Sequence, residues 1–280
     1  MSEFTSIIVA AKNACPLLQR MVESTKAIAL EATELVVVDG GSSDGTVAWL
    51  EGIAPGGSAG MLSWESRPDS GIAQAWNRGV ARARGEWLLF LGVDDRVIDT
   101  PAWNAAAAAR RDLPSSCGVA VFPVRVTSPS GALLAEERLS ISALGSRQIQ
   151  DSVPHQGAFH RRNLWAIHGL FDESFAIAAD YEFLLRVHGA GVEIRACEGP
   201  APVAMTFGGK SKRNPLANLR EFRRAQRMHG INPPLPQRCR DWLAAILRNV
   251  AATICGESFA RRWADRAREL RGLPPVWDVP

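Results

Sequence analysis

One apolar segment followed by two acids constrains the fold of this chain more than any other feature. Residues 88–95 read Leu-Leu-Phe-Leu-Gly-Val-Asp-Asp. An apolar run of this length, entered from Trp87 and closed by Gly92, is typical of a strand buried on both faces of a parallel sheet. Asp94 and Asp95 would then lie at the carboxyl edge of the sheet, where open α/β folds bind ligands. The alternative is that both carboxylates only shape a turn.

Strand and helix patterns alternate along the first hundred residues. Buried strands are predicted at 6–11, 34–38, 62–65 and 87–91, and helices at 16–29, 46–50 and 72–83. This order predicts an α/β fold, Rossmann-like, with a mostly parallel central sheet flanked by crossover helices. We expect one domain over residues 1–230, divided at about residue 98, and a basic amphipathic helical C-terminal extension over residues 231–280.

The positive charge of the chain is concentrated near its C-terminus. The 280 residues carry a net charge of +3, yet residues 207–271 hold 15 Lys and Arg against 5 Asp and Glu. Such an excess favours phosphate or an anionic membrane surface as partner. Nucleic acid would explain the basic segment but not acids at a sheet edge, so we expect no nucleic-acid partner.

An apolar stripe also marks this C-terminal segment. Trp242, Ile246, Val250 and Ile254 recur every four residues. An amphipathic helix of this kind either lies on the inner face of the cell membrane or packs on the domain or in a dimer. The oligomeric state is left open.

Features of the whole chain predict a cytoplasmic protein, soluble or peripheral at the inner membrane face. The five cysteines are widely spaced and contain no Cys-x-x-Cys pair, which favours reduced thiols. The start of the chain has no secretory leader pattern. The apolar stretch Trp242–Cys255 contains Arg248 and is too short to span a bilayer.

Two other predicted strands are also followed by acids. Asp39 ends the second strand, and Asp69 follows the third. A carboxylate at such a position can accept a hydrogen bond from a nucleobase or a ribose hydroxyl, or can cap its own loop. Asp44 is expected to cap the next helix. Three strands that bring acids to one edge favour a nucleotide pocket, in which Asp94 and Asp95 offer hard oxygen ligands to a divalent cation.

At this point three groups of segments together resemble the family 2 glycosyltransferases of the GT-A fold, of the type that builds bacterial polysaccharides. The first group contains the sequence Leu-Val-Val-Val-Asp-Gly-Gly-Ser-Ser-Asp-Gly-Thr, residues 35–46. The second group contains the acid pair Asp94-Asp95. The segments are 6–13 with 35–46, then 69–72 with 76–79 and 85–95, and lastly 155–159 with 169–173 and 178–186. The resemblance covers residues 4–211. It implies a GT-A catalytic domain over residues 1–230, with a nucleotide-binding half of about 1–98 and an acceptor-binding half of about 99–230.

The resemblance also implies roles for single residues. Asp39 would contact the base, Asp94 would face the ribose, and Asp95 would bind the divalent metal, Mn²⁺ or Mg²⁺, that holds the diphosphate. Residues 208–211, Gly-Gly-Lys-Ser, resemble the loop that closes over the donor. The expected contacts of the donor nucleotide are Ala10, Lys12, Asp39, Asp69, Asp94 and Lys210. Asp180 would be the catalytic base.

Three parts of the chain depart from the family pattern. One is Val93, which precedes the acid pair, so that only two acids stand together. Ala11-Lys12-Asn13 stands where relatives often have Thr-Tyr-Asn. An aromatic contact to the nucleobase of the donor is therefore missing, and the sequence identifies that nucleobase less well. Ala73-Gln74 stands where relatives often have Tyr-Asp. Among nucleotide donors a UDP-sugar remains the expectation.

The chemistry of sugar transfer explains why these residue types are needed. A divalent metal neutralises the charge that develops on the leaving diphosphate. The acceptor hydroxyl loses a proton as it attacks, and Asp180, at the start of a predicted helix, can accept it; the alternative is that Asp180 is only an N-cap. Glu182 is expected to point elsewhere. One base opposite the leaving group predicts inversion at the anomeric carbon.

Two further residues are candidates for binding the acceptor or the diphosphate. His155 precedes a predicted strand, and Arg186 lies on the helix of Asp180. The alternatives are a structural histidine and a helix ion pair.

The sequence therefore predicts a metal-dependent inverting glycosyltransferase. It would move a sugar from a nucleoside-diphosphate sugar to a hydroxyl of a glycan, free or linked to a polyprenyl lipid. One alternative is a catalytically inactive nucleotide-sugar-binding module. Another is a sugar nucleotidyltransferase, which would need a Gly-rich basic signature near the N-terminus, where only Lys12 is found.

Overall fold

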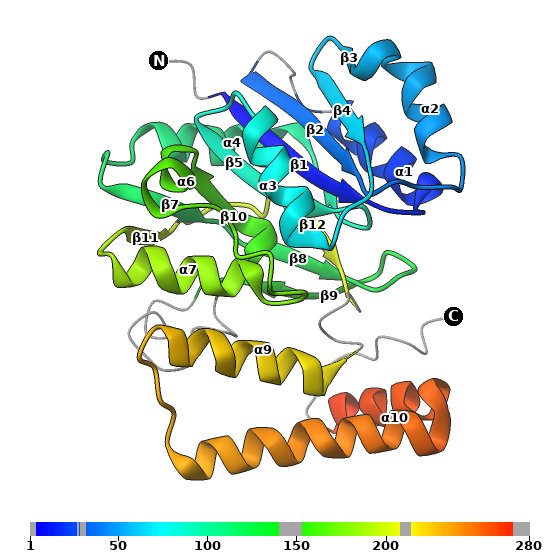
Figure 1. The fold of residues 1–280 in the computed structure, drawn as a ribbon, viewed down its shortest axis with the longest axis vertical. Helices are drawn as coiled ribbons and strands as arrows, with labels where there is room; N and C mark the ends of the chain where they lie inside the picture. Colours follow the sequence, from blue (N-terminus) through cyan, green and yellow to red (C-terminus); the bar gives the residue numbers. More distant parts are fainter. Residues whose placement is uncertain (1–3, 27, 29–31, 140–152, 208–213, 271–280) are drawn as a thin grey trace.

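The central feature of the molecule is a sheet of eight strands. The computed structural model describes residues 4–26, 28, 32–139, 153–207 and 214–270. The strand order is β11-β7-β10-β5-β1-β2-β4-β3 (Figure 1). Their bounds are β1 Thr5–Ala11, β2 Thr33–Asp39, β3 Ser58–Ala59, β4 Leu62–Ser66, β5 Trp87–Gly92, β7 Cys117–Val121, β10 Ala158–Arg161 and β11 Glu193–Ala196.

Helices cover both faces of this sheet (Figure 1). Their bounds are α1 Cys15–Lys26, α2 Thr46–Ile53, α3 Ile72–Arg82, α4 Thr100–Arg111, α6 Asn163–His168 and α7 Ala179–Gly189. Successive residues of a strand point to opposite faces. Ile8 therefore packs with α3, α6 and α7, whereas Ile7 and Val9 pack with α1, α2 and α4. The three layers and their two apolar cores confirm the predicted α/β architecture.

Parallel pairing brings the ends of the predicted strands to one edge. β1 is parallel to β2 and to β5, and Ala10 lies between Val38 and Gly92 in this register. β2 is in turn parallel to β4. β10 departs from this direction, because it inserts antiparallel between β5 and β7. The sheet is thus mostly parallel, as predicted, with its site edge at the carboxyl ends of β1, β2, β4 and β5.

One glycine allows α3 to lie close against the central strand. A Cβ on Gly79 would approach Cγ2 of Ile8 to 2.3 Å, and Ile8 is fully buried. A side chain at this position would push α3 away from β1. Gly79 therefore fixes the height of α3 above the sheet, and with it the loop before the helix.

A smaller sheet braces the turn that follows β5. Its strand order is β6-β12-β8-β9, with β6 Arg96–Val97, β8 Val124–Thr127, β9 Leu133–Glu137 and β12 Val203–Thr206. β6 follows the acid pair directly and pairs with β12. Oγ1 of Thr206 donates to the carbonyl oxygen of Asp94 at 2.7 Å. The second sheet thus holds the acid pair from the side opposite β5.

Two helices form the C-terminal layer below α7 (Figure 1). α9 spans Pro215–Met228 and packs on α7, and α10 spans Leu235–Glu269 and returns alongside α9. The helical extension is therefore present, as predicted. In the described part of the chain, no helix is both long and apolar enough to cross a bilayer.

Only part of the predicted apolar stripe on α10 packs on the domain: Trp242 is half-buried and lines a pocket with α9. Ile246 and Val250 of the stripe, and Leu243 and Leu247 beside them, are 44%, 44%, 59% and 54% exposed. The alternative that this stripe belongs to the core of the domain is therefore wrong for these four residues. The side chain of Ile254 lies outside the described part of the structure.

Candidate active site

Asp39 is built into its own loop. It is fully buried at the end of β2, and its Oδ2 accepts from the amides of Gly41 and Ser42 at 3.1 and 2.9 Å and from Oγ of Ser66 at 2.6 Å. Its Oδ1 accepts from Oγ of Ser42. A carboxylate offers about four acceptor positions. The loop therefore uses the acceptor capacity of Asp39, and the predicted contact with a base remains a prediction.

Asp44 joins the starts of two helices. Oδ1 accepts from the amide of Thr46 at 3.1 Å, and Oδ2 accepts from the amide of Cys15 at 3.0 Å. Hydrogen bonding, above all from the Cys15 amide, lowers the pKa of Asp44. The N-cap residue of α2 is Gly45, so the predicted capping role is wrong in that strict sense; Asp44 instead bonds to the first amide of α2 and to the first amide of α1.

Asp69 and Lys12 meet over the glycine that follows Asp39. An ideal Cβ on Gly40 would lie 2.5 Å from Oδ2 of Asp69 and 3.2 Å from Cδ of Lys12. Arg78 of α3 holds the Asp69 loop by donating to the carbonyl oxygens of Arg67 and Pro68 at 3.1 and 2.8 Å. The structure therefore brings together the donor-side residues predicted from separate strands.

The acid pair lies in a tight turn at the end of β5. An ideal Cβ on Gly92 would be 2.7 Å from Oδ1 of Asp94 and 3.3 Å from Oδ2 of Asp95. Asp94 is exposed, whereas Asp95 is 4% exposed and accepts from the Gly92 amide at 2.8 Å. A side chain at position 92 would push aside Oδ1 of Asp94 and crowd Oδ2 of Asp95.

The environment of Asp95 opposes its ionisation. Burial, followed by the charge of Asp94, raises the pKa of Asp95 to about 7. Hydrogen bonds from Gly92, Thr206 and the side chain of Gln156 act in the opposite direction. A carboxylate with this balance gains strongly from a bound cation.

A short 3₁₀ turn, η4 His155–Gly157, links the two acidic parts of the site. Gln156 bonds to Asp95, while Nδ1 of His155 lies 3.9 Å from Oδ2 of Asp180. A Cβ on Gly157 would approach the Phe122 carbonyl oxygen to 2.3 Å, so the turn fits closely against the sheet. Adjacent residues thus connect the predicted metal ligand with the predicted base.

His155 is held as a neutral ring in an aromatic wall. Its ring lies 5.1 Å from that of Trp76 and 5.8 Å from that of Phe90. Burial lowers the pKa of His155 to about 4, so the imidazole is uncharged at neutral pH. Within the described residues neither of its ring nitrogens has a hydrogen-bond partner. Both nitrogens are buried as well as unpaired, so a substrate oxygen could bond to them only after the side chains that cover them shift.

Asp180 lies in the first turn of α7 and does not cap it. The N-cap residue is Ala178, so the alternative of an N-cap role is wrong. Oδ1 of Asp180 accepts from the amide of Tyr181 at 2.8 Å, and its side chain is 27% exposed. Burial raises the pKa of Asp180 to about 6, and the charge of Glu221 adds to this effect. A carboxyl group with this pKa is a suitable general base near neutral pH.

Glu221 of α9 supplies the cap that Asp180 does not. Its carboxylate accepts from the amides of Ala176, Ile177 and Ala178 at 3.0, 2.8 and 2.9 Å. These amides precede α7 and need acceptors. Glu221 was not predicted, because its only sequence signal is that it is a lone acid in a basic helix.

Arg186 and Glu182 pair with each other on the far side of α7. Nε and Nη2 of Arg186 donate to the Glu182 carboxylate, and Nη1 donates to the carbonyl oxygens of His168 and Leu170 at 2.8 and 2.9 Å. Glu182 also contacts Nε2 of His229 at 3.0 Å. Glu182 points away from Asp180, as predicted, and the contacts of Arg186 favour the helix ion pair over a ligand contact.

The segment that departs from the family pattern also has structural contacts. Nε2 of Gln74 donates to Glu173 at 2.8 Å. Nδ2 of Asn77 donates to the carbonyl oxygen of Phe171 at 3.0 Å, and Oδ1 of Asn77 accepts from the amide of Phe171 at 2.9 Å. These bonds tie α3 to the segment before α7. They place the two halves of the site at a fixed separation.

The residues that could hold a metal are few. Within the described residues, no three His, Cys, Asp or Glu side chains converge as a metal cluster. Asp94 and Asp95 present oxygens to one point beside Gly92. Mg²⁺ is commonly held by one or two carboxylates together with substrate phosphates, and this pair fits that pattern. The predicted donor contact Lys210 lies outside the described residues.

The fold and the acids at its carboxyl edge define a glycosyltransferase of the GT-A class. Residues 6–159 match the family model described as glycosyl transferase family 2. An uncharacterized glycosyltransferase of Mycobacterium tuberculosis is 33% identical over 240 residues, which are 81% of this chain and 85% of the relative. A PGL/p-HBAD biosynthesis glycosyltransferase of Mycobacterium bovis is 32% identical over 184 residues, 65% and 68% of the two chains. This chain therefore belongs to glycosyl transferase family 2, and it is an enzyme.

Solved structures agree with this class. TarS 1–349 of S. aureus in complex with UDP-GlcNAc has a TM-score of 0.61 at 18% identity, covering 90% of this chain and 73% of that one. Mannosyltransferase PcManGT from Pyrobaculum calidifontis in complex with GDP-Man and Mn²⁺ has a TM-score of 0.58 at 18% identity, with 94% and 75% covered. The chain spans 44% of a longer TarS structure. The likeness at this identity is one of fold, and it confirms the predicted GT-A architecture.

Proposed function

We propose that this enzyme transfers a sugar, with inversion, from a nucleoside-diphosphate sugar to a hydroxyl group of a glycan or of a lipid-linked glycan. The observation that carries the proposal is the η4 turn, where Gln156 contacts Asp95 and His155 lies 3.9 Å from Asp180. One short segment thus sets the distance between a candidate diphosphate site and a candidate base.

The donor side of the proposal rests on the carboxyl edge of the sheet. We assign the nucleotide to the surface made by Ala10, Lys12, Asp69 and Asp94, with Asp39 shaping the loop beneath it. Asp94 is exposed and suits a ribose hydroxyl. A UDP-sugar is the proposed donor. The solved structures with this fold include complexes with UDP-GlcNAc and with GDP-Man.

A divalent metal, Mn²⁺ or Mg²⁺, fits the acid pair. Asp95, supported by Asp94, would hold it, since their oxygens meet beside Gly92 and the set is purely oxygen. When bound, such a metal neutralises charge on a leaving diphosphate. The pKa of about 7 for Asp95 means that binding the cation would release a proton near neutral pH.

The acceptor side of the proposal depends on Asp180. Its carboxylate takes the proton of the acceptor hydroxyl as that oxygen attacks the anomeric carbon, while the bond to the diphosphate breaks. We assign His155 to the acceptor side because its Nδ1 lies 3.9 Å from Oδ2 of Asp180; a hydrogen bond from the acceptor to this ring requires the side chains over its buried nitrogens to shift. A single base opposite the leaving group gives inversion.

The donor-binding half is proposed as residues 1–98 and the acceptor-binding half as residues 99–230, followed by the helical extension. The proposed location is the cytoplasm, at the inner face of the cell membrane.

An inactive binding module would not need Asp180 held with a raised pKa. The nucleotidyltransferase alternative would require a Gly-rich basic loop before α1, which the sequence lacks.

The test is calorimetric titration of UDP, GDP and dTDP into the full chain, with and without Mn²⁺, repeated on Asp95→Asn. Metal-dependent binding of one nucleotide, lost in the variant, is expected. Turnover of the matching sugar nucleotide, followed by NMR of the anomeric proton of the product, then reports the stereochemistry. Absence of nucleotide binding under every condition, or a product with retained configuration, would overturn the proposal.

A further inference from the structure

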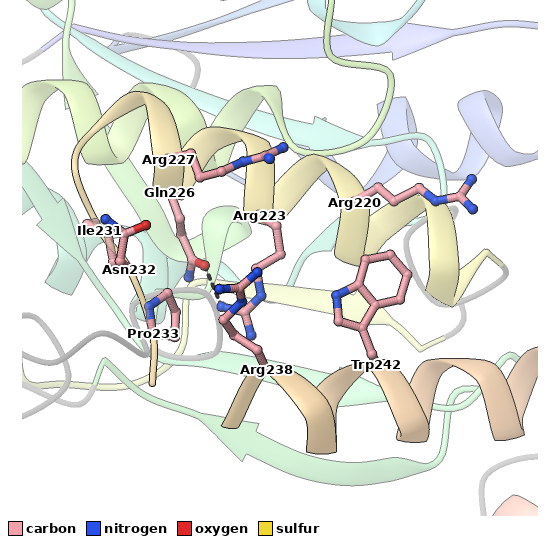
Figure 2. Close-up of a pocket in the computed structure, with 9 residues that line it drawn as sticks. All are labelled: Arg220, Arg223, Gln226, Arg227, Ile231, Asn232, Pro233, Arg238 and Trp242. Carbon is pink, nitrogen blue, oxygen red and sulfur yellow. Dashed lines mark hydrogen bonds between the residues drawn. The ribbon is translucent and has the colours of Figure 1, made fainter. Parts of the chain in front are cut away.

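A second site, which unlike the first is positively charged, lies between the two C-terminal helices (Figure 2). A pocket of about 180 Å³ is lined from the α9 side by Arg220, Arg223 and Arg227 and from the α10 side by Arg238 and Trp242. Pockets that enclose a whole small molecule measure roughly 300–1,000 Å³. This pocket is therefore of a size to hold one charged group of a larger ligand.

The charges of the pocket are not balanced by the protein. Asp241 pairs with Arg223, and it also faces Arg240 at 3.7 Å. In the described part of the chain, Arg220, Arg227 and Arg238 take part in no ion pair, and each of them is exposed. Guanidinium groups that gather without enough carboxylates repel one another until an anion joins them.

The buried member of the cluster is incompletely bonded. Arg223 is 9% exposed, and its Nη1 donates to Oε1 of Gln226 at 2.6 Å (Figure 2). Its Nε is buried and has no hydrogen-bond partner among the described residues. A buried N–H of a charged group without a partner is unfavourable. This atom therefore indicates an anionic acceptor at the floor of the pocket.

The surface beside the pocket is apolar. The exposed stripe of Leu243, Ile246, Leu247 and Val250 begins one residue after Trp242 on α10. Trp residues are favoured where an apolar phase meets water, because the ring is largely apolar and its N–H is polar. A ligand that satisfies both surfaces has a phosphate head, which guanidinium groups bind in a bidentate manner, and an apolar chain.

We propose that this pocket binds the phosphate headgroup of a membrane lipid, while the apolar stripe of α10 enters the acyl region. The pocket is also bonded to the helix of the candidate base. Nε2 of Gln226 donates to Oη of Tyr181 at 3.1 Å, and Tyr181 follows Asp180. A lipid phosphate held here would thus place α7 next to the membrane surface. The proposal does not depend on the sugar-transfer reaction, since lipid binding is measured without a donor.

The test is sedimentation of the full chain with vesicles of phosphatidylcholine alone or mixed with phosphatidylglycerol, in EDTA. The pocket variant is Arg227→Gln combined with Arg238→Gln. The control is Arg240→Gln combined with Arg262→Gln, which also removes two positive charges. Both residues are exposed on α10 and lie outside the pocket lining. Unchanged circular dichroism and melting temperature establish that each variant is folded.

The expected result is binding to the phosphatidylglycerol vesicles that falls at least about tenfold in the pocket variant and only about threefold or less in the control. Equal loss in both variants would assign the binding to diffuse charge and overturn the proposal. So would unchanged binding in the pocket variant, or no vesicle binding by the unmodified chain.

A second measurement separates the lipid from a free anion. Inorganic pyrophosphate is titrated into the metal-free protein, and vesicle binding is measured for Leu243→Ser combined with Leu247→Ser. We expect this apolar variant to lose vesicle binding while pyrophosphate binding stays unchanged. If pyrophosphate binds the pocket but neither the unmodified chain nor the apolar variant binds vesicles, the lipid assignment is overturned in favour of a soluble anion.

Discussion

Asp39 and Asp95 end neighbouring parts of the same sheet edge, yet the protein treats their carboxylates in opposite ways. Asp39 is surrounded by donors from its own loop and from Ser66. Asp95 is equally buried, but it faces another carboxylate, and its pKa is raised to about 7. A fully bonded acid builds the scaffold, whereas an acid held in an unfavourable environment is prepared for a ligand. Asp180 belongs with Asp95 in this respect, because its pKa is raised to about 6.

The largest effect is expected from removing the proposed base, Asp180. Asp180→Asn keeps the shape of the side chain but cannot accept the proton, so kcat should fall by about 10²–10⁴. Donor binding should stay within a factor of two or so, because Asp180 is not on the donor side. Steady-state kinetics and calorimetry measure the two quantities. A variant with normal kcat would place the base elsewhere.

The same comparison predicts a pH dependence. The pKa of Asp180 is raised, so the carboxyl becomes neutral as the pH falls through about 6 and loses its ability to take a proton. The value of kcat/KM should therefore rise with pH up to about 6 and level off above it. A pH–rate profile at saturating metal tests this. A flat profile between pH 5 and 7 would contradict the assignment.

Asp39→Asn should destabilise the fold by about 3 kcal/mol. The substitution replaces one acceptor oxygen by an NH₂ donor. This donor would face the N–H and O–H groups of Ser42, Gly41 or Ser66, which are donors themselves. Hydrogen bonds to charged groups are worth about 1.5–3 kcal/mol each. Urea unfolding of the metal-free protein measures the change. Asp69→Asn, in an exposed part of the same edge, is the control and should change stability by less than about 0.5 kcal/mol.

Asp95→Asn should have the opposite effect on stability. The folded-state pKa is raised, so the ionised form of Asp95 destabilises the fold increasingly as the pH rises from about 4 through about 7. Removing that charge should raise the free energy of unfolding at pH 8 by about 2 kcal/mol, and the gain should vanish near pH 4. Urea unfolding at both pH values is the measurement, and a loss of stability at pH 8 would refute the distinction drawn between Asp39 and Asp95.

The smallest effect is expected at Glu221, which positions the helix of Asp180 without touching substrate. Glu221→Gln weakens three bonds to the amides before α7 and removes a negative charge near Asp180. We expect kcat to fall about tenfold with the donor KM unchanged, and the acid limb of the pH profile to move to lower pH. An unchanged limb would indicate a purely structural role.

The sequence and the structure agree where a signal is local. The run before Asp95 and the loop after Asp39 identify strand ends, and the position of Arg186 on a predicted helix made an ion pair an alternative, which the structure shows with Glu182. The roles of Gln156 and Glu221 arise only when distant segments meet, so no spacing in the chain reveals them. The exposure of Leu243 was equally hidden, because an apolar stripe looks the same whether it faces a core or a bilayer.

The antiparallel strand β10 has a consequence for exchanging parts between relatives. It belongs to the half that we propose binds the acceptor, yet it pairs with β5 through His160 and Leu88 and with β7 through Phe159 and Ala120. Arg161 adds contacts to Glu86 and to the carbonyl oxygen of Cys117. A chimera cut at residue 98 would therefore break a sheet in its middle. We therefore expect exchanges of specificity between relatives to fold when they replace loops, and to fail when they replace halves.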